Sequence, residues 1–160
     1  MPRHKAGFFC YNRIMKYKHT QIGWVIMIVL LLVTFGIFAS SFFVDEAFGK
    51  NILMAGGLLF LVLSGMFSTL TVEITQYELK WYFGPIPLIK RSIELSDILS
   101  VKKTKTKIIE GWGIHYTRRG WLYNVSGRDA ILITKSDGTT ATTAMIGTDE
   151  PETLIKMLGH

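Results

Sequence analysis

The chain has 160 residues, room for about one ordinary domain, and its composition excludes a single water-soluble globule. Hydrophobic residues make up 49% of it and charged residues only 19%, below the roughly 25% of an average soluble protein. The shortage is local, because two long stretches, 22–44 and 52–72, contain no charged residue. The composition therefore predicts a membrane protein that carries a small water-facing domain.

The formal charge of +6 is concentrated ahead of the first apolar stretch. Residues 1–21 hold five basic and no acidic side chains, whereas residues 73–160 hold 12 basic and 10 acidic ones. The second region lacks the concentrated basic footprint of a nucleic-acid-binding domain. No nucleic-acid partner is expected.

The two apolar stretches predict a transmembrane helical hairpin over 22–72. At 23 and 21 residues, both are long enough to cross a hydrocarbon core about 30 Å thick. A cleaved signal peptide is the alternative for 22–44, but its apolar run exceeds the usual length of such a segment. Neither stretch holds an ionisable side chain of the kind that marks ion pathways and proton relays. The hairpin is therefore interpreted as an anchor.

The distribution of basic residues predicts the orientation. The rule that cytoplasmic loops carry the excess of Lys and Arg places the basic leader 1–21 and the region 73–160 in the cytoplasm. The acidic connector 45–51 then lies outside. We expect a multi-pass protein of the cell membrane with both termini cytoplasmic, translated from Met1 or from Met15.

From residue 73 onward the hydrophobic period changes from helical to two, which predicts short strands. Seven antiparallel strands are expected at 72–74, 79–83, 88–95, 98–106, 111–116, 130–134 and 140–146. A final helix follows, with Asp149 as its N-cap and Glu152 three residues later. Seven strands and one C-terminal helix are the order of a pleckstrin-homology-like (PH-like) barrel.

The segments 81–101, 111–139 and 146–158 carry a resemblance to a known family. The sequence resembles small bacterial membrane proteins in which two transmembrane helices precede a bacterial PH-like domain. The resemblance implies an α+β membrane protein, with a helical hairpin followed by a seven-stranded antiparallel PH-like barrel over 73–160. It implies a fold and a location, and it does not point to any particular biochemical activity.

No catalytic, cofactor-binding or metal-binding motif is recognisable. The chain has no nucleophile elbow, no phosphate-binding loop and no cluster of His with carboxylates. The single Cys10 excludes an internal disulfide and a zinc site built from cysteines. His115 lies in an aromatic-rich strand and is interpreted as a structural residue. The protein is predicted not to be an enzyme and to need no cofactor or metal.

A basic strand is the strongest positional signal. Its candidate lipid-contact residues are Lys102, Lys103, Lys105, Lys107, Arg118 and Arg119. They could meet anionic lipid headgroups, or they could form a solvated strand whose lysines prevent edge-to-edge aggregation.

An aromatic group within 111–127 is the candidate partner contact. It consists of Trp112, Trp121 and Tyr123. If these rings are exposed, they are candidate hot spots, because interface anchors favour Trp and Tyr. If they are buried, they fill one end of the barrel.

Together these features predict a non-enzymatic, membrane-anchored interaction module. It would present a small β-domain at the cytoplasmic face to a protein partner or to its own copies. The alternative is a sensor of anionic lipid headgroups that uses the strand Lys102–Lys107.

Overall fold

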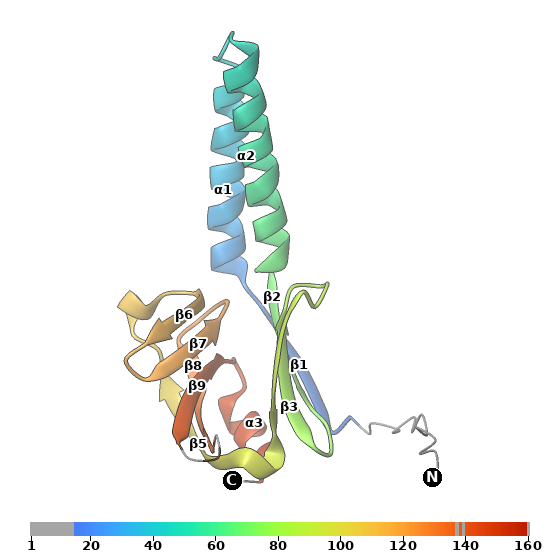
Figure 1. The fold of residues 1–160 in the computed structure, drawn as a ribbon, viewed down its shortest axis with the longest axis vertical. Helices are drawn as coiled ribbons and strands as arrows, with labels where there is room; N and C mark the ends of the chain where they lie inside the picture. Colours follow the sequence, from blue (N-terminus) through green and yellow to red (C-terminus); the bar gives the residue numbers. More distant parts are fainter. Residues whose placement is uncertain (1–14, 137, 139, 160) are drawn as a thin grey trace, which may run out of the picture.

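The computed structural model describes residues 15–136, 138 and 140–159, so the first 14 residues of the expected leader lie outside it. The fold is α+β (Figure 1). Its elements are β1 (Tyr17–Ile22), α1 (Trp24–Ser41), α2 (Ala47–Met66), β2 (Thr69–Ile74), β3 (Glu78–Phe83), β4 (Ile89–Glu94), β5 (Ile98–Lys105), β6 (Gly113–Thr117), β7 (Gly120–Asn124), β8 (Asp129–Ser136), β9 (Ala141–Gly147) and α3 (Pro151–Leu158). Two 3-10 turns, η1 (Leu95–Asp97) and η2 (Ile108–Glu110), flank β5.

The helices α1 and α2 lie side by side and project from the β-domain (Figure 1). Both are long and apolar enough to cross a membrane. Their limits differ from those expected, because Thr69–Ile74 is a strand and α2 begins inside the expected connector. The reason is physical: a continuous apolar run is compatible with a buried strand as well as with a helix. Leu70 and Val72 are core residues of β2.

The first sheet has the strand order β1-β2-β3-β4 and is antiparallel throughout. Tyr17–Ile22, which was expected within the leader, is its first strand and pairs along its full length with β2. The pairing continues beyond the strands, since the Gly23 amide donates to the Ser68 carbonyl at 2.7 Å. The two helices therefore stand where a β1–β2 hairpin would have its turn.

The second sheet has the order β5-β8-β9-β7-β6. Its pairs are antiparallel except for β7 and β9, which run parallel. The expectation of a closed, seven-stranded antiparallel barrel is wrong on two counts. The described residues form nine strands, with β1 and β7 in addition to those expected, and the strands divide into two separate sheets at η1.

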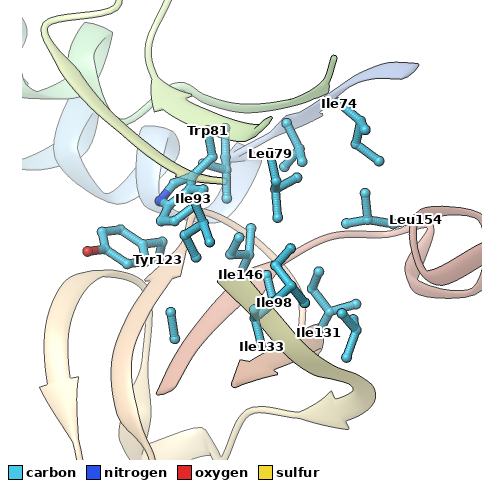
Figure 2. Close-up of a cluster of buried hydrophobic side chains, with 14 of the residues drawn as sticks. Ile74, Leu79, Trp81, Ile93, Ile98, Tyr123, Ile131, Ile133, Ile146 and Leu154 are labelled. Atoms are coloured by element: carbon cyan, nitrogen blue, oxygen red, sulfur yellow. The ribbon is translucent and has the colours of Figure 1, made fainter. Parts of the chain in front are cut away.

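The hydrophobic core fills the space between the two sheets (Figure 2). It contains Leu70, Val72, Ile74, Leu79, Trp81, Phe83, Ile93, Ile98, Val101, Tyr123, Val125, Ile131, Ile133, Ala144, Ile146 and Leu154. Alternate residues of each strand point inward, as the period of two requires. From α3, Leu154 is fully buried in this core, and Ile155 and Leu158 pack against it.

The start of α3 differs from the expectation. Glu150 occupies the N-cap position, and no side chain caps the helix. The carboxylate of Asp149 instead lies 2.5 Å from Nε2 of His19 on β1. Asp149 thus connects the start of α3 to the first sheet.

Candidate ligand cleft

A cleft of about 400 Å³ lies between the two sheets. The first sheet supplies Trp81, Ile89, Arg91, Ser92 and Ile93, and the second supplies Ile114, Trp121, Tyr123, Lys135, Thr142, Thr143 and Ala144. It adjoins β4 and β6, each of which is the last strand of its sheet.

The aromatic surface of the cleft comes from β3 and β7. Trp81 packs edge-to-face on Tyr123, with ring centroids 5.2 Å apart. Trp121 lies two residues before Tyr123, and its ring is stacked at 6.5 Å from that of Tyr123. Alternation along β7 turns both side chains to the same face, so the two sheets together make one aromatic surface.

An unpaired donor lies in this surface. The side chain of Trp81 is only 3% exposed, and its indole Nε1 has no hydrogen-bond partner among the described residues. The Thr142 hydroxyl is also buried and has no hydrogen-bond partner among the described residues. Figure 2 shows Nε1 of Trp81 and the hydroxyl of Tyr123 on the same side, away from the isoleucine cluster. A buried donor left unpaired costs roughly 1–3 kcal/mol, so these groups favour a bound acceptor.

The cleft is basic. Arg91 and Lys135 belong to its lining, and no Asp or Glu does. Arg91 stands opposite Trp81 in the β3–β4 register, and Lys135 stands opposite Thr142 in the β8–β9 register. Each cation therefore shares a face with one of the unpaired groups. The arrangement suits an anion that has an apolar body.

Across the described residues, no group of three His, Cys, Asp or Glu side chains is placed to hold a metal ion. The lining of the cleft presents hydrogen-bond donors, two cations and aromatic faces.

Two of the three predicted partner-contact residues meet in the cleft. Trp121 is 47% exposed there, whereas Tyr123 is almost fully buried beneath it. Trp112 lies elsewhere: its indole donates to the Gly127 carbonyl at 3.2 Å, and its side chain is 43% exposed. The aromatic group of the sequence thus divides into a cleft part and a separate residue.

The predicted lipid-contact residues do not form one free surface. Lys103 is paired with Glu152 of α3, and Lys105 lies 3.7 Å from Asp129. Arg119 donates to Glu110, to the Thr104 hydroxyl and to the Lys105 carbonyl, so it holds local structure together. Three members remain exposed without an ion pair among the described residues: Lys102, Lys107 and Arg118. Since β5 is an edge strand, its lysines also suit the protection of that edge.

Four residues of the cleft do not stand out in the sequence as members of one site: Trp81, Arg91, Lys135 and Thr142. One signal was readable, because Arg91 stands between Ile89 and Ile93 on the face of β4 that should be apolar. A cation in that position indicates an opening in the core. The other three depend on how the sheets pack, which alternation within single strands does not describe.

Comparison of the chain with protein-family models, curated proteins and solved structures finds no match. The resemblance to bacterial PH-like membrane proteins stays a prediction.

Proposed function

We propose that the protein is a non-enzymatic, membrane-anchored binding module. The helices α1 and α2 cross the cell membrane, and the β-domain offers the inter-sheet cleft to a protein partner on the cytoplasmic side. The observation that carries the proposal is the buried, unpaired indole N–H of Trp81 in a cleft bordered by Arg91 and Lys135.

The surface of the helices supports the anchor. Large apolar side chains of both helices are exposed, among them Leu32, Phe35 and Leu58, so neither is the core helix of a soluble domain. At about 1.5 Å per residue, 18 and 20 residues come to about 27 and 30 Å, close to the hydrocarbon thickness of about 30 Å. Cleavage of α1 as a signal peptide would also remove β1, which pairs with β2.

The chemistry of the cleft supports an acidic, partly apolar peptide segment as the ligand. Trp and Arg side chains only donate hydrogen bonds, so they require an acceptor such as a carboxylate. The exposed ring of Trp121 offers an apolar contact next to it. The edge strand β4 adjoins the cleft, and an extended segment can add to such an edge through backbone hydrogen bonds.

Photo-cross-linking in cells tests this function. The photo-reactive residue p-benzoylphenylalanine replaces Trp121 in the full chain, and in a matched control it replaces Trp112, which is about as exposed but lies outside the cleft. We expect a discrete protein adduct from position 121 and none from position 112. An adduct with another copy of the chain would identify self-association. Equal adducts at both positions, or none at 121, would contradict the proposal.

A second variant tests the hydrogen bond. Trp81→Phe keeps a large ring and removes the indole N–H. A hydrogen bond to a charged acceptor contributes roughly 1.5–3 kcal/mol, so we expect the adduct at position 121 to fall about tenfold or more. Circular dichroism checks that the variant is folded, and an unchanged yield would remove Trp81 from the site.

The alternative function is an anionic-lipid sensor. It is favoured by the exposed side chains of Lys102, Lys107 and Arg118, which have no ion pair among the described residues. Cross-linking from position 102 in the same cells tests it. Lipid adducts at 102, together with no protein adduct at 121, would support the sensor over the peptide-binding module.

A further inference from the structure

Two loops of the β-domain end in exposed apolar side chains. Between β3 and β4, Ile86 and Leu88 are 67% and 69% exposed. In η2, between β5 and β6, Ile108 and Ile109 are 81% and 94% exposed. Adjacent isoleucines at such exposure are unfavourable in water, and they call for a covering surface.

The first tip lies beside the end of α2. The Gly84 amide donates to the Thr69 carbonyl at 2.9 Å, which fixes the start of the loop three residues after α2 ends. An apolar groove of about 180 Å³ separates the loop from the helix, lined by Val62, Gly65, Met66, Pro85, Ile86 and Leu88. Any lipid around the base of α2 therefore meets this tip.

The second tip lies at the helix-facing end of the other sheet. The loop 125–128 contacts the residues just before α1, because Gln21 Nε2 donates to the Ser126 carbonyl at 3.1 Å. The same loop holds both ends of the η2 segment, through Thr106 N to Arg128 O at 2.7 Å and Trp112 Nε1 to Gly127 O at 3.2 Å. Figure 1 shows the segment between β5 and β6 at the end of its sheet that faces the helices.

The surroundings of η2 are cationic and aromatic. Lys107 and Arg118 are exposed, and the nearby carboxylate of Glu110 is already paired with Arg119. Tyr116 is also exposed beside them. Apolar tips flanked by cations and an aromatic ring are typical of segments that lie in the interface of an anionic membrane.

We infer that both tips enter the interfacial layer of the membrane that α1 and α2 cross, so that the β-domain is held against the bilayer on two sides of the helix pair. The inference rests on the transmembrane anchor of the proposed function and is independent of the cleft. It differs from the lipid-sensor alternative because apolar side chains at the helix-facing end make the contact, whereas Lys107 and Arg118, which both proposals share, only flank them.

Site-directed fluorescence on the full chain tests the inference. In a Cys10→Ser background, a single cysteine at 86 or 109 carries an environment-sensitive NBD probe in nanodiscs of phosphatidylcholine and phosphatidylglycerol. Position 32 in α1 is the reference for the span, and position 99 is the control. Leu99 is apolar and exposed like the tips, but it stands at the opposite end of β5 from η2. We expect spin-labelled lipids to quench probes at 32, 86 and 109 at least twofold more than at 99.

Each outcome decides one point. If the probe at 32 is not quenched, the helices do not cross the membrane and the proposed function fails with the inference. If 32 is quenched while 86 and 109 behave like 99, only the docking of the tips is overturned. If 32, 86 and 109 are quenched and 99 is not, both stand.

A label-free measurement guards against an effect of the probe. Amide hydrogen exchange over 106–112 in nanodiscs should speed up at least threefold in the variant Ile108→Ser/Ile109→Ser, because the segment leaves the interface. Exchange over 129–136 in β8 should not change. An unchanged rate over 106–112 would overturn the contact of η2 with the membrane.

Discussion

A glycine at the start of β7 fixes the parallel approach of that strand to β9. Gly120 has a φ of +104°, and a Cβ added there would lie 2.1 Å from the carbonyl oxygen of Thr143. That oxygen belongs to the backbone of β9 and cannot turn aside. Gly120 therefore serves both the conformation of the β6–β7 turn and the close contact between two strands.

Gly120→Ala is expected to lower the free energy of unfolding by more than about 3 kcal/mol, since backbone strain and strand separation add. The matched control is Gly159→Ala, which also has a positive φ but no atom within 4 Å of the added Cβ. Its expected cost is about 1–2 kcal/mol, from the left-handed conformation alone. Chemical denaturation followed by tryptophan fluorescence measures both, and equal losses would contradict the steric argument.

The carboxylate of Glu110 closes the η2 segment. It accepts hydrogen bonds from the Lys107 amide at 2.6 Å and from Arg119 Nη2 at 2.7 Å. Burial acts to raise the pKa of Glu110, but these hydrogen bonds and the charge of Arg119 outweigh it, so the pKa lies below the ordinary value. The charged form is therefore the one that stabilises the fold.

The lowered pKa of Glu110 predicts that the free energy of unfolding depends on pH. A pKa that is lower in the folded than in the unfolded chain gives stability that is present above the unfolded value, about 4.3 for Glu, and is lost as pH falls through the folded value. The difference in unfolding free energy between the wild type and Glu110→Gln should be constant from about pH 6 to 8 and shrink below about pH 4. A difference that grew on acidification would contradict the sign.

At the scale of elements, the sequence predicted the strands whose own residues alternate between apolar and polar. All seven expected strands have a counterpart, and the final helix lies where its apolar stripe indicated. The two missed strands lack that signal. The inward side chains of β1 are Tyr17, His19 and Gln21, too polar to suggest a core. The residues of β7 fall within the stretch bounded by Gly111 and Gly127, whose glycines favour loops over a regular strand.

The helix α3 packs on the two sheets through the buried Pro151 and Leu154 and the partly buried Ile155 and Leu158. Leu154 is fully buried in the common core, whereas Met157 is 39% exposed. Leu154→Ala should cost roughly 2–5 kcal/mol of unfolding free energy because it leaves a cavity, and Met157→Ala less than about 0.5 kcal/mol. Thermal unfolding measures the pair, and a similar loss in both would mean that α3 contributes through its length and not through its buried contact.

At the scale of the whole molecule, the sequence predicted the helices and two residues of the cleft. It did not predict how the two sheets pack to form that cleft. Trp121 and Tyr123 were recognised as aromatic contacts, and their meeting with Trp81 depends on the packing of one sheet on the other. The division into two sheets and the parallel β7–β9 pair are also long-range properties. Hydrophobic period reports which face of a strand is buried, and it carries no information about which strand lies next to it.

The topology predicts that α1 and α2 can be removed without loss of the β-domain. The Gly23 amide donates to the Ser68 carbonyl, so these residues stand opposite each other where a short hairpin turn would begin. Replacing residues 24–67 by Asn-Gly supplies the two-residue turn that favours such hairpins. The shortened chain should be soluble and folded, with a cooperative thermal transition and dispersed amide resonances.

The matched comparison is residues 73–160 alone, which lack β1 and most of β2 and with them the buried Leu70 and Val72. That fragment should lack the transition, because the first sheet loses β1 and most of β2, two of its four strands. If it folds as well as the hairpin-joined chain, β1 is dispensable and the helices are a separate leading anchor. If the joined chain folds and the fragment does not, α1 and α2 are an insertion into a β-hairpin of the domain that carries them.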